Sequence, residues 1–266
     1  MAESTSRRGV LVTGGAQRLG AAVCEAFARA GWAVWCQYRA SRDPAEALCA
    51  KLRAEGATAN AVEADIGSEE GRRALIAPIS TGDAPLGCIV NNASAFEPDS
   101  GLDFEADAAL RPLAVNLIAP LSLARLLAQR AVPGDGIDRS AIHILDQKVY
   151  NLNPTIFRTR CPSWRWSARF RCRRIACARG ARRGVAPGIL FTSGPQDQAN
   201  FDKASRANLL RRPIDPADVA AACVFLATTR SACGTTLCVD NGQHLVPLER
   251  DIMFVVDELL NKEPKS

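Results

Sequence analysis

Apolar residues near the start of the chain first form a continuous run and then recur at helical spacing. Residues 9–12 are apolar without a break, which is typical of a buried strand. Residues 21–30 carry apolar side chains at helical spacing and stop at Gly31. Between them lies the segment 13–20, Thr-Gly-Gly-Ala-Gln-Arg-Leu-Gly. The pattern predicts a strand, a glycine turn and a helix.

The alternation of strand and helix patterns continues along the chain. Further buried strands are expected at 33–37, 58–63, 88–90 and 141–145, and the last strand within 234–242. A helix is expected to begin at Asp43 as N-cap with Pro44 in its first turn, and another at Asp215 as N-cap with Pro216 following. A long helical stretch covers 110–131. We therefore expect a doubly wound α/β (Rossmann) fold with a parallel sheet, as a single domain over residues 1–266.

The glycine turn has the chemistry of an anion site. The first N–H groups of a helix have no partner within the helix, and the helix dipole is positive at that end. Without side chains at Gly14 and Gly20, a pyrophosphate can approach these groups closely. Glycine turns also occur as plain corners between a strand and a helix, so the rest of the chain has to decide.

The end of the second predicted strand lacks the acidic residue that would accept from a ribose 2′-hydroxyl in a site for NAD. Arg39 and Ser41 stand there instead, with Arg18 possible as a neighbour from the turn. A guanidinium complements a 2′-phosphate, which favours NADPH. The alternative is that Arg39 and Arg42 are solvated loop charges.

Composition limits the class of protein. A chain of 266 residues with 47% hydrophobic residues can bury a full core. No run of about 18 apolar residues is present, so no membrane span is expected. The ten cysteines form no Cys-x-x-Cys pair and only two histidines accompany them. We expect a reduced, cytoplasmic protein without a metal site.

The net charge of +5 comes from one segment. Residues 158–183 hold ten arginines and no Lys, Asp or Glu, which leaves 23 basic against 28 acidic residues in the rest of the chain. Trp164, Trp166 and Phe170 lie among the arginines, a combination that also occurs in nucleic-acid-binding surfaces. The segment stands in place of a core helix, so nucleic acid is the less favoured partner.

Two motifs resemble one enzyme family. The pattern Thr-Gly-x-x-x-(Gly/Arg)-x-Gly at 13–20 and the pattern Asn-Asn-Ala-Ser at 91–94 resemble the short-chain dehydrogenase/reductase superfamily. Arg18 and Ser94 are similar to its pteridine reductase and dihydromonapterin reductase branch, and 147–154 continues that likeness. The resemblance implies NADPH as cofactor, a pterin or dihydrofolate-like small-molecule substrate, and a homotetramer whose contacts are in doubt here.

The resemblance implies a set of cofactor-binding residues. Asp65 would bond the adenine ring, although it could equally be the N-cap of a helix near residue 68. Residues 187–189 would close over the nicotinamide amide, and 191–210 would form a substrate lid. The full set is Gly14, Gln17, Arg18, Leu19, Gly20, Tyr38, Arg39, Ser41, Asp65, Ile66, Asn92, Ala93, Ser94, Pro187 and Gly188.

The family's substrate and catalytic roles map onto fewer residues. Ser94, Phe96 and Tyr150 would contact the substrate, with Phe96 stacking a pterin ring; as alternatives, Ser94 caps a turn and Phe96 belongs to the core. Asn116 would hold a water of the proton relay, since an asparagine in an apolar helix needs a partner. Asp146 stands where most of the superfamily has the catalytic serine. The pterin branch has an aspartate at this place.

The chain departs from the family at its central catalytic motif. A tyrosine, with a lysine four residues later, should donate the proton; a phenol of pKa near 10 needs that neighbouring ammonium. The expected positions are Thr159 and Ser163, and Pro162 together with the arginines disrupts the expected helix. As written, the reductase should be impaired.

A shifted reading frame would explain the departure. With free choice of synonymous codons, the codons for 158–167 can spell Tyr-Thr-Leu-Ser-Lys-Leu-Ala-Leu-Glu in a neighbouring frame, and the family pattern resumes at 185–188. We hypothesise that residues 158–183 are a frame-shifted reading of an ordinary reductase gene. The alternative is a pseudoenzyme that binds NADPH without turnover.

Overall fold

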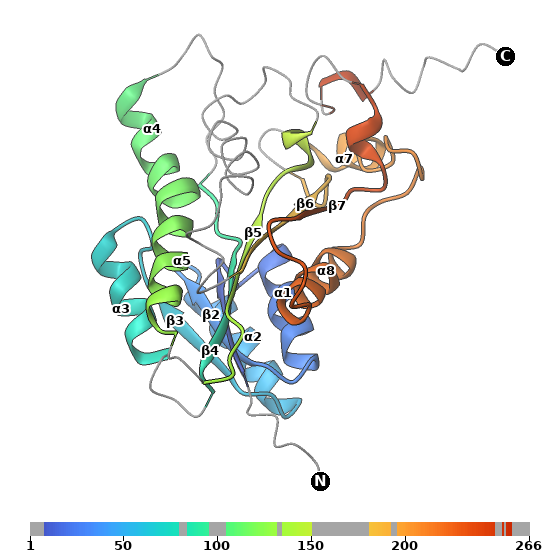
Figure 1. Ribbon diagram of the computed structural model, residues 1–266. Coiled ribbons are helices and arrows are strands. Elements are labelled where there is room, and N and C mark those ends of the chain that lie inside the picture. The colour runs from blue at the N-terminus through green and yellow to red at the C-terminus, as the bar shows by residue number, and fades with distance from the viewer. Residues whose placement is uncertain are drawn as a thin grey trace, which may run out of the picture.

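A seven-stranded parallel sheet forms the centre of the computed structural model (Figure 1). The structure describes residues 8–79, 84–95, 105–131, 135–150, 181–192 and 196–247, together with 252 and 254–256. The strand order is β3-β2-β1-β4-β5-β6-β7. The strands are β1 (Gly9–Thr13), β2 (Ala33–Tyr38), β3 (Ala59–Glu63), β4 (Leu86–Asn91), β5 (Ser140–Ile144), β6 (Ala181–Pro187) and β7 (Thr236–Val239). The predicted doubly wound fold is confirmed.

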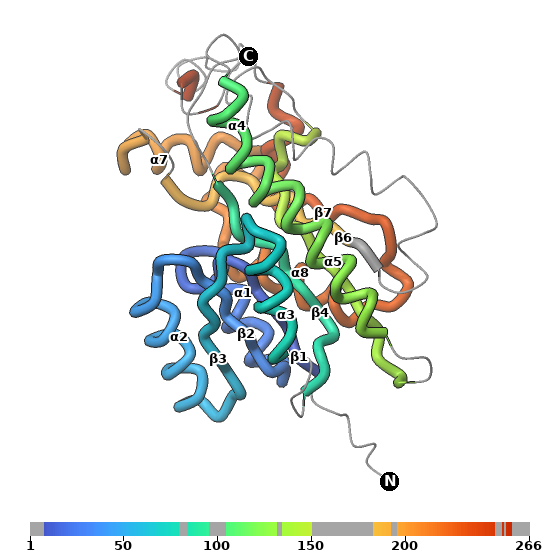
Figure 2. Tube along the Cα trace, turned by 90° about the vertical axis from the view of Figure 1, so that its left-hand side faces the viewer, coloured from blue at the N-terminus to red at the C-terminus, as the bar shows by residue number. Residues whose placement is uncertain are grey.

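Helices cover both faces of this sheet (Figures 1 and 2). Helices α1 (Arg18–Arg29), α2 (Arg42–Ala54) and α8 (Pro216–Thr228) contribute to one buried cluster, whose largest fully buried side chain is Phe27. Helices α3 (Glu69–Ile79) and α5 (Ala119–Gln129) contribute to the cluster on the other face. The short α7 (Gln198–Ala204) lies above the carboxyl edge of the sheet.

The long helical stretch predicted at 110–131 consists of three joined segments. Helix α4 (Ala106–Leu113) passes through a π-helical segment, η1 (Ala114–Ile118), into α5. By length and composition, the helix from 106 to 129 could cross a membrane. Half of its most apolar 18-residue stretch is buried, and core helices of globular proteins can have the same length and composition. The π-helical segment holds Asn116, one of the predicted catalytic residues.

The predicted helix starts are partly right. Asp215 caps α8, because its side chain accepts from the N–H of Ala217 at 2.8 Å. The prediction for α2 was wrong: the helix begins at Arg42, Ser41 occupies the N-cap position without a side-chain bond, and Asp43 lies in the first turn. An acidic side chain in the first turn still complements the helix dipole, so the sequence signal was displaced by two positions.

The arginine-rich segment enters the described structure only at its end. Residues 158–180, with Thr159 and Ser163, lie outside the described residues. Arg183 on β6 is buried, and its guanidinium donates to the carbonyls of Thr229, at 2.8 Å, and Ala232. Because these carbonyls follow the C-terminus of α8, Arg183 neutralises their partial negative charge.

Burial of Phe27 provides a test of the packing between α1 and the sheet. Phe27 is fully buried and meets Trp32 edge-to-face with ring centroids 5.3 Å apart. Phe27→Ala should lower the free energy of unfolding by about 3–5 kcal/mol through lost contacts and a cavity. Phe225→Ala, at a half-exposed position, should cost about 0.5 kcal/mol or less. Urea unfolding of both variants measures the difference; equal losses would contradict this packing.

Candidate nucleotide-binding site

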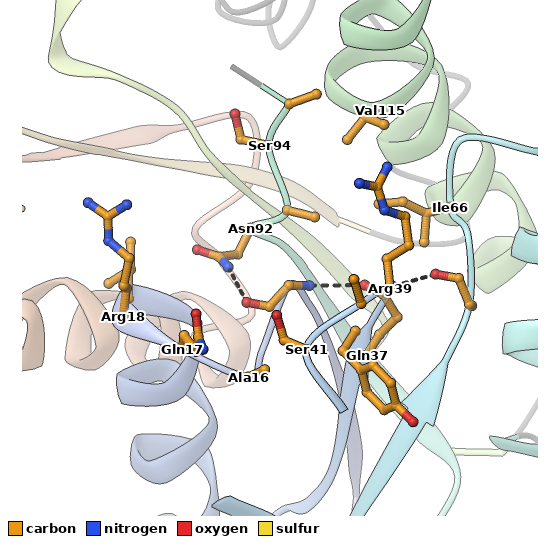
Figure 3. Close-up of a pocket in the computed structure, with 18 of the residues that line it drawn as sticks. Ala16, Gln17, Arg18, Gln37, Arg39, Ser41, Ile66, Asn92, Ser94 and Val115 are labelled. Carbon is orange, nitrogen blue, oxygen red and sulfur yellow. Dashed lines mark hydrogen bonds between the residues drawn. The ribbon is translucent and has the colours of Figure 1, made fainter. Parts of the chain in front are cut away.

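A cavity of about 520 Å³ opens where the carboxyl ends of the central strands meet (Figure 3). In a doubly wound sheet this edge, next to the point where the strand order reverses, is where ligands bind. Its walls come from the glycine turn, the ends of β2, β3 and β4, helix α4, η1 and the segment after β6. The lining residues are Gly14, Ala16–Gly20, Gln37–Ser41, Ala64–Ile66, Asn92–Ala95, Arg111, Val115, Leu190 and Phe191.

Close backbone packing explains the glycines of the turn. Gly14 has φ +60°, and a Cβ on Gly20 would lie 2.1 Å from the carbonyl oxygen of Gly14. A side chain at either position would therefore distort the turn. Gln17 occupies the N-cap of α1 and makes no side-chain bond to the first turn. The N-terminus of α1 thus faces the cavity uncapped by Gln17, as an anion site requires.

Two amide side chains hold the turn from below. The Gln37 Oε1 accepts from the N–H of Gly14 at 2.9 Å, and its Nε2 donates to the carbonyl of Ala64 at 2.7 Å. The Asn92 Nδ2 donates to the carbonyls of Thr13 and Gly14, each at 3.0 Å. These bonds join β1, β2, β3 and β4 at their carboxyl ends, so the turn is fixed before any ligand binds.

Basic and hydroxyl groups surround the cavity at the end of β2. Arg39 is exposed, Ser41 is half-buried, and both line the cavity. Tyr38 is buried, and burial raises the pKa of its phenol. Arg42 pairs with Glu63 and stacks over the Tyr38 ring, and it is not part of the cavity wall. The structure thus separates Arg39 from its neighbour Arg42.

Arg18 connects the glycine turn to the segment that follows β6. It adopts a left-handed backbone conformation with φ +52°, which is uncommon for a residue other than glycine. Its guanidinium lies 4.8 Å from the centroid of the Phe191 ring and donates to the carbonyl of Thr192 at 2.7 Å. Leu190 and Phe191 line the cavity, so the predicted lid segment begins at its wall.

Asp65 lines the cavity next to Ile66, which Figure 3 shows on the side opposite Arg18. Its carboxylate accepts from the N–H of Gly67 and from both terminal nitrogens of Arg111 on α4. The bonds from Arg111 hold the pKa of Asp65 below its usual range. Asp65 is not the N-cap of α3, because the Ser68 hydroxyl accepts from the N–H of Gly71 in that turn.

Asn116 is bound to the strand end that carries Ser94. Its Oδ1 accepts from the N–H of Ala95 and its Nδ2 donates to the carbonyl of Ala95, both at 2.8 Å. The side chain therefore fixes the path of the backbone beyond β4. Asn92, Ala93 and Ser94 all line the cavity, whereas Phe96 lies outside the described residues.

The remaining predicted residues lie at the edge of the sheet but not in the cavity wall. Asp146 caps the short η2 (Gln147–Val149), accepting from the N–H of Lys148. Tyr150 is half-exposed and packs against His244 with ring centroids 5.8 Å apart. Pro187 ends β6, and neither it nor Gly188 reaches the wall. The family-derived roles of these residues stay predictions.

One group among the described residues has donors of the kind that bind metals. Cys238, Asp240 and His244 place one donor atom each within 4.8 Å of one another. The Asp240 carboxylate already accepts from the N–H groups of Gly242 and His244 and bonds the His244 ring at 2.7 Å. These bonds hold the turn after β7, where Asn241 adopts a left-handed conformation with φ +53°.

Known proteins share this fold and this sequence pattern. The family model described as short chain dehydrogenase matches residues 8–136. An uncharacterized oxidoreductase of Mycobacterium tuberculosis is 30% identical over 247 residues, which cover 87% of this chain and 90% of that protein. The chain belongs to the short-chain dehydrogenase family. The resemblance inferred from the glycine turn is thereby confirmed.

Within the family, the similar proteins differ in activity. L-rhamnose 1-dehydrogenase (NAD(P)(+)) of Sphingomonas sp. is 27% identical and matches 89% of this chain and 96% of its own length. The crystal structure of FolM alternative dihydrofolate reductase 1 from Brucella canis, complexed with NADP, is 30% identical with a TM-score of 0.85. It covers 95% of this chain and 100% of its own. The fold alone therefore does not select a substrate.

The structure adds two polar cavity residues, Gln37 and Arg111, that the sequence analysis missed. Gln37 could have been noticed, because it is a polar residue within an otherwise apolar strand. Arg111 gave no such signal, since it is 46 residues from Asp65 and looks like any charged residue on a helix. The two meet only because the folded chain places α4 beside the loop that follows β3.

Gln37 offers a test of how the turn is held. Gln37→Leu leaves the Gly14 N–H and the Ala64 carbonyl without this partner, and should lower the free energy of unfolding by about 1–3 kcal/mol. Gln17→Leu changes the same kind of side chain at an exposed position of the same turn and should cost about 0.5 kcal/mol or less. Chemical denaturation compares the two variants. A larger loss for Gln17→Leu would refute this account.

Proposed function

We propose that this chain is built as an NADPH-dependent oxidoreductase whose substrate is a pterin or a dihydrofolate-like compound. The observation that carries the proposal is the cavity at the end of β2. It combines the open N-terminus of α1 with Arg39 and Ser41 and has no acidic side chain at the strand end. Structures similar to this chain contain NADP, which supports the same cofactor here.

The residues present fit a dinucleotide phosphate. Gly14 and Gly20 of the glycine turn line the cavity, and the N-terminus of α1 provides N–H donors for the pyrophosphate. Arg39 and Ser41 would complement the 2′-phosphate, and Asp65 with Ile66 would border the adenine ring. When bound, the cofactor supplies a hydride. The chain's own part is to hold it, to exclude water and to place the substrate.

The substrate end of the site rests on fewer observations. Ser94 lies at the strand end fixed by Asn116, and Asp146 stands at the end of β5, as in the pterin branch that the sequence resembles. The similarity to an alternative dihydrofolate reductase supports a pterin-like ring as substrate. Phe96 and Tyr150 remain proposed contacts for that ring.

Proton donation is the step for which the chain has no suitable group at the family position. Thr159 and Ser163 occupy the places of the tyrosine and the lysine. A threonine hydroxyl is a far weaker acid than a phenol, and serine carries no charge to lower a neighbouring pKa. We therefore infer that the chain binds NADPH but reduces its substrate poorly.

Cofactor selection is tested by binding, which does not depend on catalysis. Arg39→Gln should weaken binding of NADPH by about tenfold, because a charge-assisted contact to the 2′-phosphate is lost, and leave NADH nearly unchanged. Arg42→Gln is the control, since Arg42 lies outside the cavity wall. Fluorescence titration of the bound nicotinamide measures both dissociation constants. Equal weakening for NADPH and NADH would count against a 2′-phosphate site at Arg39.

Activity is tested on two versions of the chain. One version is the protein with its present sequence, and the other carries the shifted reading of residues 158–183. With dihydropterin or dihydrofolate as substrate, the first should oxidise NADPH more slowly than the second by a factor of about 10² or more. General acid catalysis typically contributes a factor of that size. Sequencing the gene from the codon for Asn153 to the codon for Pro187 decides which version exists. A restored version that binds NADPH without turnover of either substrate would contradict the proposed substrate class.

A further inference from the structure

A group of three chemically different donors lies at the carboxyl end of β7, outside the wall of the candidate nucleotide cavity. Cys238 belongs to this edge strand, Asp240 follows it directly, and His244 belongs to the short η3 (Gln243–Leu245). One donor atom from each residue lies within 4.8 Å of the other two: a sulfur, a carboxylate oxygen and a ring nitrogen. The turn after β7 therefore gathers donors that the chain alone does not place together.

Hydrogen bonds hold the carboxylate and the imidazole side by side. Nδ1 of His244 lies 2.7 Å from Oδ2 of Asp240, and the backbone N–H of His244 donates to the same oxygen at 2.7 Å. The N–H of Gly242 donates to Oδ1 at 3.0 Å. The two backbone bonds fix the carboxylate, and a separation of 2.7 Å means that one proton is shared between Nδ1 and Oδ2. A cation can take the place of that proton.

Burial leaves the carboxylate short of positive charge and the group open on one side. The Asp240 side chain is 3% exposed, whereas the His244 side chain is 26% exposed and Cys238 is half-buried. Among the described residues, the ion-pair partner of Asp240 is His244, which is charged only when it is protonated. A buried carboxylate is stabilised by pairing or by binding a metal ion. The exposed edge of the His244 ring marks the side from which an ion can enter.

The types of donor atom select the kind of cation. Mg²⁺ and Ca²⁺ take oxygen ligands, so a sulfur and a ring nitrogen disfavour both. Zn²⁺ is bound by cysteine, histidine and aspartate in any combination, and it deprotonates a thiol that it coordinates. A site with three protein ligands keeps a fourth position for water. The donor set therefore matches Zn²⁺.

The same turn supports the segment after β6. The N–H of Gly188 donates to the carbonyl of Val239 at 3.2 Å, and the N–H of Ile189 donates to Oε1 of Gln243 at 2.9 Å. Leu190, the next residue, lines the candidate nucleotide cavity. A cation that fixes the turn would therefore also fix the path of the chain into the cavity wall.

We propose that Cys238, Asp240 and His244 form a binding site for Zn²⁺, with water as the fourth ligand. The sequence has no Cys-x-x-Cys pair and only two histidines, which is why no metal site is predicted from it. The donor that such a count leaves out is the carboxylate of Asp240. The inference is independent of the proposed function, because it requires neither a nucleotide nor turnover.

The experiment uses Co²⁺ as a probe, because Co²⁺ bound to a thiolate absorbs strongly in the near ultraviolet and Zn²⁺ does not. The full chain is treated with a chelator, kept reduced and titrated with cobalt chloride. The thiolate-to-cobalt band should saturate at about one ion per chain, and added Zn²⁺ should abolish it. Cys238→Ser should remove the band. His244→Gln should weaken Zn²⁺ binding by about tenfold or more, since loss of even an outer partner of a ligand typically costs 10–100-fold.

Cys233→Ser is the matched control. Cys233 is an exposed cysteine in the loop before β7, and the substitution should leave the cobalt band unchanged. Zn²⁺ should raise the unfolding temperature of the original chain and of Cys233→Ser, but not that of Cys238→Ser or His244→Gln. An original chain without the band overturns the inference. A band that persists unchanged in Cys238→Ser also overturns it, because the ion then binds other cysteines, and His244→Gln provides the same comparison if Cys238→Ser does not fold.

Discussion

The fixed glycine turn is the constraint on which the rest of the site depends. Its backbone groups are bonded to side chains from neighbouring strands, namely Gln37 from β2 and Asn92 from the end of β4. Thr13 adds to this, since its hydroxyl accepts from the N–H groups of Asn92 and Ala93. These bonds satisfy polar groups of the turn from the side of the sheet, so the N-terminus of α1 stays directed at the cavity. The fold therefore preorganises an anion site.

The two halves of this site are unequally supported. The half that would bind a nucleotide is complete in the described residues, with basic groups at Arg18, Arg39 and Arg111 and one carboxylate at Asp65. The proposed proton-transfer half would depend on positions 159 and 163, where the sequence has threonine and serine and which lie outside the described residues. In the proposed function, binding and catalysis are therefore separable, because the described residues that line the cavity lie outside the segment 158–183.

Local sequence patterns determined most of the fold. Apolar runs predicted six of the seven strands, because strands of a parallel sheet are covered on both faces; β6 was not predicted, since its first half carries Arg182 and Arg183. A second error occurred at the start of α2, where two neighbouring residues could serve the same purpose and Ser41 rather than Asp43 takes the N-cap position. The glycine turn was predictable because few residues other than glycine allow its close backbone approach.

By itself, the sequence determined the α/β class, the glycine turn, the missing acid at the end of β2 and the absence of Tyr-x-x-x-Lys, since each depends on residues close together in the chain. Only the tertiary structure decided which distant side chains meet. It joined Arg111 to Asp65, assigned Asn116 to Ala95 and separated Arg39 from Arg42 at the cavity wall. These pairings depend on how helices pack over strand ends, which residue spacing along the chain does not encode.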